Sequence, residues 1–232
     1  MKIFLSILFC VIFSGSVYPQ CNPFFPLQEN VRYEYEMYDK KEKVTMRMSH
    51  TFRNISGSGD NMNATLAQDI YDPKKDEKIS TSELNWKCEN GTLHFDMRSM
   101  SLMMDNGQQM NMGDAGMSVD VTGDELDLPS ELSVGKTLKD VSYNIKMAMS
   151  GITLMNRTFN IKDRKVESQE KVTTPAGSFD CYKVTYTTVD DKGRGATRSA
   201  IWYAKDAGMV KTENYKEDGK LINRQVLVKL VR

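Results

Sequence analysis

Apolar and polar residues alternate with period two along most of this chain after its first twenty residues. The segment from Val31 to Met37 carries an apolar side chain at every second position. The segment from Val44 to Arg53 repeats the pattern after a polar turn at 39–42. Because successive side chains of a strand point to opposite faces, each segment has one face for an apolar interior and one for water. Together the two segments are typical of a β-hairpin.

The same pattern continues to the C-terminus between short segments rich in turn residues. Further strands are expected near 61–71, 84–88, 93–97, 141–149, 157–163, 164–173, 182–186, 199–203, 208–215 and 221–231. Asn90-Gly91 is the strongest hairpin signal, because both of its turn positions need positive φ. Residues 126–132 have the composition of a turn or a single helical turn. We therefore predict an all-β protein, an antiparallel meander that forms a curved open β-barrel of about 11–12 strands.

The first twenty residues have the features of an export signal. A positive Met1-Lys2 precedes an apolar run of eleven residues at 3–13, and small residues follow at 14–16. This pattern is typical of a secretory signal peptide and too short for a membrane helix, which needs about 20 apolar residues. We therefore expect a signal peptide at 1–20 and a single exported β-barrel-like domain at 21–232. Its expected place is the periplasm or the cell surface, without a transmembrane span.

Cys21 raises a lipoprotein alternative, because a lipidated cysteine would be the first residue of the mature protein. The residue before such a cysteine is normally small, and here Tyr18-Pro19-Gln20 precede Cys21. Cleavage between Ser16 and Cys21 is therefore favoured over lipidation.

Three cysteines remain after export: Cys21, Cys88 and Cys181. An oxidising compartment permits one disulfide and leaves one thiol over. If four antiparallel strands lie between Cys21 and Cys88, the start of the first and the end of the fourth lie at the same edge of the sheet. This parity predicts a Cys21–Cys88 disulfide and leaves Cys181 as a small buried hydrophobe inside a strand. Three free thiols are the alternative.

Charge and histidine content exclude several classes of function. Lys+Arg and Asp+Glu balance at 31 each, and no basic stripe indicates nucleic-acid binding. Of the two histidines, His50 lies on an apolar face and is expected to be a satisfied interior group, whereas His94 is expected to face solvent. Gln68 and Asn85 near strand interiors suggest some polar groups in the lumen. No nucleophile–base pattern and no calcium loop occurs, so we expect no enzyme, no metal and no cofactor.

Methionine is unusually frequent, with sixteen in the chain and six between Met100 and Met117. The segment lacks a clear period, and loops of this length are usually functional or disordered. Thioether side chains adapt to varied apolar shapes. We therefore predict a mobile lid over the open end of the barrel, formed by Met103, Met104, Met110 and Met112. Plain packing remains open, as does a Cu(I) site, although neither His nor Cys lies within the segment.

Five motifs give the chain a family resemblance. They are the segment Val172–Tyr182 (VTTPAGSFDCY), the segment Trp202–Val210 (WYAKDAGMV), Gly219-Lys220-Leu221, Cys21-x4-Pro26-Leu27 and Cys88-Glu89-Asn90-Gly91. With these motifs the chain resembles the uncharacterised exported TapB-like family, common in Bacteroidetes-type bacteria, over nearly the whole mature chain. The resemblance implies an open, curved antiparallel barrel similar to the LolA/LolB lipoprotein carriers. It implies no catalytic residue, and this chain lacks the long helices that plug LolA-type barrels.

A long sheet with one apolar face must cover that face, either with a ligand or with the protein's own side chains. We predict a non-catalytic exported envelope protein that binds a lipid or a hydrophobic small molecule within its curved β-sheet. The expected lining residues are Tyr33, Tyr35, Met46, Met48, Phe52, Trp86, Met147, Met149 and Trp202, with Trp202 and Tyr203 both on the inner face. The alternative is a cell-surface interaction or assembly protein with a filled barrel core and an envelope protein partner. A cavity larger than a few waters favours the first, and a filled interior with an exposed apolar patch favours the second.

Overall fold

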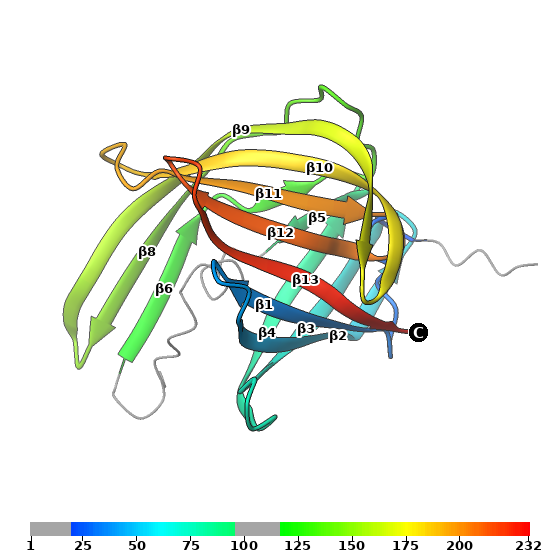
Figure 1. Cartoon of the computed structure of the whole chain (residues 1–232), viewed down its shortest axis with the longest axis horizontal. Coiled ribbons are helices and arrows are strands. Elements are labelled where there is room, and N and C mark those ends of the chain that lie inside the picture. The colour runs from blue at the N-terminus through cyan, green and yellow to red at the C-terminus, as the bar shows by residue number, and fades with distance from the viewer. Residues whose placement is uncertain (1–19, 96–116) are drawn as a thin grey trace, which may run out of the picture.

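The computed structural model describes residues 20–95 and 117–232. Within these ranges thirteen antiparallel strands form one curved sheet (Figure 1). The all-β prediction is therefore confirmed, with slightly more strands than the expected 11–12. The predicted signal peptide and the four predicted lid methionines lie outside the described residues, apart from Gln20.

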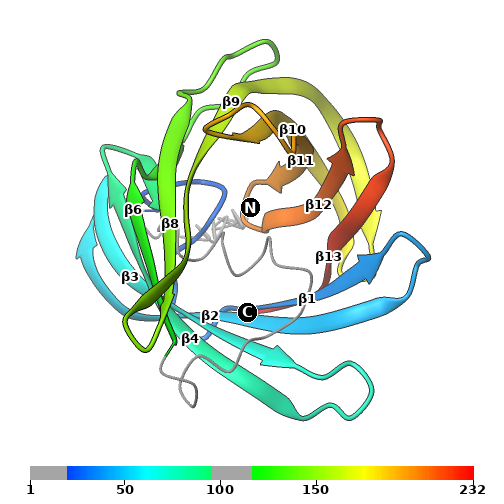
Figure 2. The same cartoon turned by 90° about the vertical axis from the view of Figure 1, so that its left-hand side faces the viewer.

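The sheet is a meander whose two ends come from the middle of the chain. Its strands are β1 (Arg32–Asp39), β2 (Val44–Ser58), β3 (Asn61–Tyr71), β4 (Lys78–Glu89), β5 (Thr92–Phe95), β6 (Met117–Gly123), β7 (Leu126–Leu128), β8 (Val141–Met149), β9 (Ile152–Thr174), β10 (Gly177–Asp190), β11 (Thr197–Ala204), β12 (Gly208–Lys216) and β13 (Leu221–Val231). Their order is β6-β8-β9-β10-β11-β12-β13-β1-β2-β3-β4-β5-β7. The sheet curls around an interior, and its edge strands β6 and β7 do not pair with each other (Figure 2).

Two local expectations were wrong. The segment expected to form two strands, 157–163 and 164–173, is part of one 23-residue strand, β9. Asp163 has a φ of 57°, and the pairing with β10 shifts register nearby, so the chain bulges there instead of reversing. Leu126–Leu128, expected to be a turn, is strand β7 and pairs with β5. Pro129 limits it to three residues.

The main core lies on the concave face and follows the alternation of the sequence. Tyr33, Tyr35, Phe52, Leu66 and Leu84 are at most 3% exposed, and all belong to one cluster. A large apolar side chain that is fully buried stabilises the fold by about 1.5–3 kcal/mol. The polar residues between them face outwards. Alternation therefore determines which face of each strand is dry.

A second cluster lies on the opposite face, beneath the bent end of the β9–β10 hairpin. It contains Val172, Cys181, Ala200, Trp202, Ala204, Ala207 and Val210. Figure 1 shows this hairpin end curving across the right-hand end of β11 to β13. The Trp202 Nε1–H donates to Glu170 Oε1 (2.5 Å), and the Lys211 ammonium lies 4.0 Å from the indole centroid. Trp202 therefore fastens the hairpin to the outer face.

The expectation that Trp202 and Tyr203 share the inner face was wrong. Tyr203 belongs to the main core, whereas Trp202 belongs to the outer cluster. Adjacent residues of a strand point to opposite faces, so only one of the two rings can face the interior. Trp202 is nevertheless only 4% exposed, because the bent hairpin covers it.

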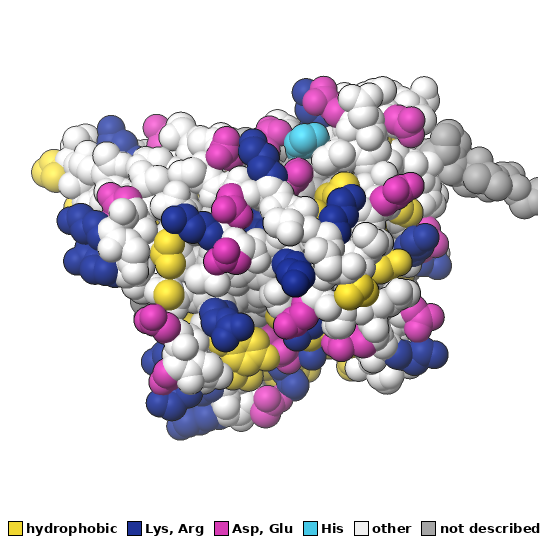
Figure 3. Space-filling view, turned by 90° about the horizontal axis from the view of Figure 1, so that it is seen from above, with side chains coloured by type: hydrophobic (Ala, Val, Ile, Leu, Met, Phe, Trp, Pro, Cys, Tyr) yellow, Lys and Arg dark blue, Asp and Glu magenta, His cyan; other side chains and the backbone are white. Residues whose placement is uncertain are grey.

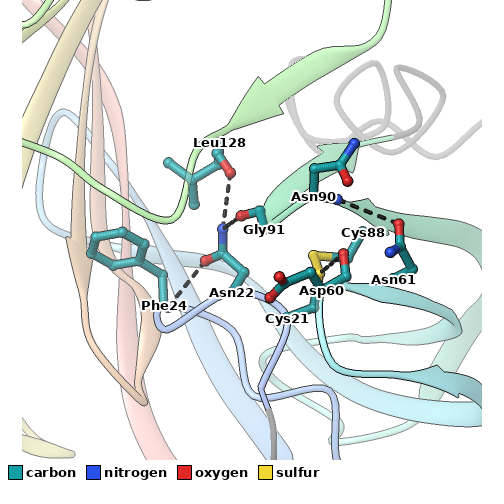
Figure 4. The surroundings of a disulfide bond; sticks show 9 residues. All are labelled: Cys21, Asn22, Phe24, Asp60, Asn61, Cys88, Asn90, Gly91 and Leu128. Carbon is teal, nitrogen blue, oxygen red and sulfur yellow. Dashed lines mark hydrogen bonds between the residues drawn. A yellow bond between two sulfur atoms is a disulfide. The ribbon is translucent and has the colours of Figure 1, made fainter.

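The N-terminal arm, residues 20–30, closes the right-hand end of the sheet in Figure 1. A disulfide joins Cys21 to Cys88 at the end of β4, as the parity argument predicts (Figure 4). The Asn22 amide donates to the carbonyls of Gly91 (3.1 Å) and Leu128 (2.9 Å). One buried side chain thereby joins the β4–β5 turn to β7.

The arm also holds the turn between β11 and β12. The Gly208 N–H donates to the Phe24 carbonyl (2.7 Å), and the Asp206 N–H donates to the Pro23 carbonyl (2.8 Å). Gly208 has a φ of 66°, and a Cβ atom there would lie 2.4 Å from the Phe25 ring. Only glycine allows the turn to approach the arm this closely.

We expect the Cys21→Ser/Cys88→Ser variant to lose about 4 kcal/mol of unfolding free energy, because the disulfide closes a loop with a sequence separation of 67. Urea denaturation of both proteins, with and without reductant, measures this loss. Reductant should lower the midpoint of the wild type and leave that of the variant unchanged. An equal effect of reductant on both proteins would contradict the assignment.

Candidate ligand-binding site

Aromatic side chains of the arm and the sheet fill the interior at the disulfide end. Trp86 on β4 is at the centre of this group. Its indole contacts the rings of Phe25, Phe52 and Phe95 edge-on, with centroids 5.1, 5.1 and 4.7 Å away. Phe24 packs in the same way against Tyr203, at 6.3 Å. Edge-on contacts of this kind add about 0.5–1.5 kcal/mol beyond the area that they bury. This end of the interior is therefore packed.

Further along the inner face, four polar side chains form a row across β1 to β4. Strand register pairs Tyr33 with His50, His50 with Gln68, and Gln68 with Ser82. Among the described residues, Tyr33 Oη, His50 Nε2, both polar atoms of the Gln68 side chain and Ser82 Oγ have no hydrogen-bond partner. An unsatisfied buried polar group costs about 1–3 kcal/mol. These four side chains, here called the unpaired row, therefore reduce the stability of the folded protein.

Three polar residues elsewhere on the inner face do find partners. Ser199 on β11 donates to Asn214 Oδ1 (2.7 Å), and Asn214 Nδ2 donates to Asn223 Oδ1 (2.8 Å). These three residues are neighbours on β11, β12 and β13. On the same wall Thr188 Oγ1 and Gln225 Nε2 have no partner among the described residues, so buried polar atoms without partners also occur outside the unpaired row.

The unpaired row is electrically neutral at pH 7. Burial lowers the pKa of His50 to about 4, so the imidazole is uncharged. Burial also raises the pKa of Tyr33 well above its usual value. The Tyr35 ring lies 5.0 Å from His50, which is 5% exposed. The row can therefore offer neutral donors and acceptors, but no charge. His50 is an interior residue, as expected. Its Nε2 has no hydrogen-bond partner among the described residues, so the expectation that the side chain is satisfied was wrong.

A cavity of about 590 Å³ lies where the free edge of β6 approaches β3 and β4. Its lining combines apolar residues of both sides, Ala64, Trp86 and Val121, with the residues Asn54, Asn63, Thr65, Asn85, Lys87, Thr122, Gly123, Asp124 and Glu125. This volume is within the range of small-molecule sites, and the lining is mostly polar, with three apolar residues among twelve. We call it the seam cavity.

Trp86 connects the seam cavity to the packed interior. It lines the cavity, belongs to the aromatic group and is 6% exposed. Its Nε1–H has no acceptor within the described part of the chain. A buried indole N–H usually finds a partner. A molecule in the cavity could therefore contact the apolar ring of Trp86.

Short connections fix the corner at which the seam cavity forms. Gly123 ends β6 with a φ of 129°, and a Cβ atom there would lie 2.5 Å from the Ser142 carbonyl oxygen. The Asp124 carboxylate accepts from the Ser142 N–H (3.0 Å). The buried Arg164 donates to Asp127 Oδ1 (2.5 Å) and to the Lys139 carbonyl, which holds β7 in place. The geometry of the corner is therefore determined by several contacts.

The nine predicted lining residues have different places in the structure. Six are buried in the main core: Tyr33, Tyr35, Met46, Met48, Phe52 and Trp86. Of the nine, Trp86 alone is among the residues that line the seam cavity. Met147 is half-buried against the core, and Trp202 lies on the outer face. Met149 is 40% exposed, because the β8–β9 hairpin continues beyond the core, which alternation alone does not show.

Most residues of the seam cavity were not predicted. The cavity forms between β3–β4 and β6, which are far apart in sequence and do not pair. No local pattern identifies such a site. Two polar residues near strand interiors, Gln68 and Asn85, were the available signals. Gln68 is a member of the unpaired row, and Asn85 lines the cavity.

No group of three or more His, Cys, Asp or Glu side chains among the described residues could hold a metal ion. No helix in the described ranges is long and apolar enough to cross a membrane.

Comparison with known proteins identifies the family and the fold. The profile of a family described as DUF3108-like matches residues 28–227. A protein of Bacteroides fragilis, described as a predicted exported protein with a YmcC-like fold, has 22% sequence identity and a TM-score of 0.73. A predicted lipoprotein of Parabacteroides distasonis has 23% identity and the same TM-score. Each match covers 91% of this chain and 100% of the other. No curated protein matches the sequence.

The pKa of His50 predicts a loss of stability in mild acid. In the folded protein the pKa of His50 is about 4, against 6.5 for an exposed histidine, so the unfolded chain binds more protons between these values. Stability from this group is complete above pH 6.5 and is lost as the pH falls towards 4. Between pH 7.5 and 4.5 the loss should be about 2.5 kcal/mol.

Urea denaturation of the wild type and of His50→Gln at both pH values isolates this contribution. Other groups titrate equally in the two proteins, so the wild type should lose more stability than the variant. Parallel losses in both proteins would show that His50 does not titrate in this way.

Proposed function

This chain belongs to the DUF3108-like family, and we propose that it is a non-catalytic exported envelope protein that binds a hydrophobic or lipid-like ligand. The seam cavity is the observation that carries the proposal, because its volume suits a small molecule and the apolar residues Ala64, Trp86 and Val121 lie among its polar lining side chains. The N-terminal apolar run of the sequence supports export. Two similar structures, one described as a predicted exported protein and one as a predicted lipoprotein, support the same compartment.

The proposed ligand has an apolar part and a small polar part. Ala64, Trp86 and Val121 would contact the apolar part, and Asn63 and Asn85 are available to the polar part. Burial of an alkyl chain gains about 0.8 kcal/mol for each methylene group. About six buried groups would give roughly 5 kcal/mol before the cost of association is subtracted. This favours an alkyl or acyl compound over a small polar metabolite.

The resemblance to the TapB-like family and to the LolA/LolB carriers belongs to the same proposal. A lipoprotein carrier needs a curved sheet that encloses an apolar group. LolA-type carriers plug their barrel with long helices. Here the arm residues Phe24 and Phe25 fill one end of the interior instead. The arm therefore leaves the seam, rather than the disulfide end, as the route to the concave face.

An interaction or assembly protein of the cell surface is the second candidate. Two observations favour it: the packed aromatic group at the disulfide end and the exposed apolar residues of the β8–β9 hairpin, Met149, Ile152 and Leu154. These are the filled core and the apolar patch expected of a protein that binds other proteins.

The two tryptophans allow a direct test. Trp86 lines the seam cavity, whereas Trp202 lies in the outer cluster. Trp202→Phe and Trp86→Phe therefore each leave a single fluorophore in a known place. Bromine quenches indole fluorescence on contact, so 12-bromododecanoic acid should quench Trp202→Phe saturably and leave Trp86→Phe unchanged. Unbrominated dodecanoic acid should reverse the quenching. Quenching of Trp202 alone, or of neither indole, would refute binding in the cavity.

A substitution that fills the cavity should weaken this binding. Val121→Phe adds volume at the cavity wall, and Val119→Phe is its control on the same strand and face, outside the cavity lining. In the Trp202→Phe background, the first should raise the dissociation constant at least about tenfold, which corresponds to about 1.4 kcal/mol. The second should leave it unchanged. Equal effects of the two substitutions would place the ligand elsewhere.

A further inference from the structure

The β8–β9 hairpin has an exposed apolar tip. Met149, Ile152 and Leu154 are 40%, 68% and 53% exposed, and they are three of the five large apolar side chains that are exposed in the described ranges. The turn between the strands is Ser150-Gly151, with φ values of 49° and 82°, which suits a tight two-residue hairpin turn. Figure 1 shows this hairpin at the left-hand end of the molecule, away from the N-terminal arm.

The charges near the tip are mainly positive. Residues 141–162 contain Lys146, Arg157 and Lys162 and no acidic residue. Asp120 on β6 pairs with Lys146 in the sheet and offsets one of these charges. Residues 147–156, which include the tip, carry no charge. In Figure 3 a hydrophobic side chain marks the left-hand extremity of the molecule, with Lys and Arg side chains beside it.

Apolar residues connect the tip to the seam cavity along the inner face of the hairpin. Strand register pairs Met149 with Ile152, and Met147 with both Met155 and Val119. Val119 and Val121 are alternate residues of β6, and Val121 lines the cavity. The path changes from exposed at the tip to half-buried at Met147 and buried at the core.

We propose that the tip of the β8–β9 hairpin, Met149–Leu154, inserts into the interface of a phospholipid membrane, with Lys146 and Arg157 at the level of the headgroups. A bilayer accepts apolar side chains of any arrangement, so a protruding apolar tip suits a membrane interface. Cationic side chains behind an apolar tip suit the anionic lipids of a membrane surface. This contact does not require a ligand in the cavity.

Vesicle flotation of the full mature protein tests the proposal. The vesicles contain phosphatidylethanolamine and phosphatidylglycerol at 3:1, and no fatty acid is added. The wild type should float with the vesicles, and Ile152→Ser/Leu154→Ser should lose at least about tenfold in partition coefficient, since two exposed apolar side chains are removed. The control Ile79→Ser/Val134→Ser removes two other exposed apolar side chains and should float like the wild type.

A gain-of-function variant keeps the test independent of folding defects. Ile152→Trp should float at least as well as the wild type, and brominated phospholipids in the vesicles should quench its added indole. Four outcomes would overturn the proposal: no flotation of the wild type, equal flotation of the Ile152→Ser/Leu154→Ser variant, an equal loss in the control, or no quenching of Ile152→Trp. A dimer that the serine variant abolishes, without flotation of the wild type, would assign the tip to a second copy of the chain. The quenching experiment with bromododecanoic acid uses no vesicles. Its result for ligand binding in the seam cavity is therefore independent of the result for membrane binding.

Discussion

The hydrogen bonds and the disulfide of the N-terminal arm hold together a sheet that does not close on itself. A curved sheet with unpaired edges leaves one end of its apolar interior open to water. The arm covers this end with Phe24 and Phe25 and is fixed by the bond from Cys21 to Cys88. Asn22 alone ties the β4–β5 turn to β7, and Gly208 brings the β11–β12 turn against the arm. The first described residues of the chain therefore join strands from both of its halves.

Trp86 links this anchorage to the proposed site. It lies two residues before Cys88 on the same face of β4, so the disulfide that fixes the arm also fixes the strand that carries the indole. The indole packs against Phe25 of the arm and lines the seam cavity on its other side. A rigid aromatic wall of this kind needs little reorganisation on binding, which reduces the cost of association.

Much of this architecture could be read from the sequence, and the limits have physical reasons. Period-two alternation determines the face of each strand, so Tyr33, Tyr35 and Phe52 were correctly placed in the interior. Strand parity predicted the Cys21–Cys88 disulfide correctly. The prediction needed only the number of chain reversals between the two cysteines. Alternation contains no information on where a strand leaves the body of the sheet. This explains why Met149 was predicted to line the interior but is exposed. Alternation also cannot show that a bent hairpin buries an outward-facing side chain. This explains why Trp202 was predicted on the inner face but lies in the outer cluster. The seam cavity depends on the approach of unpaired edges, for which the chain has no local pattern.

The location of the seam follows from the length of one connection. β6 ends at Gly123 and β7 begins at Leu126, so the two edge strands of the sheet are joined by Asp124 and Glu125 alone. The three Cα–Cα steps from Gly123 to Leu126 span at most about 11 Å when extended, which holds the edges close at this corner. The seam cavity lies at this corner, between β3 and β4 and the edge of β6 that pairs with no other described strand. The unpaired row lies deeper on the same strands, on Gln68 of β3 and Ser82 of β4, and it is neutral because burial keeps His50 uncharged. A molecule that enters from the seam would therefore meet the mixed polar and apolar lining of the cavity first and uncharged hydrogen-bonding groups further in.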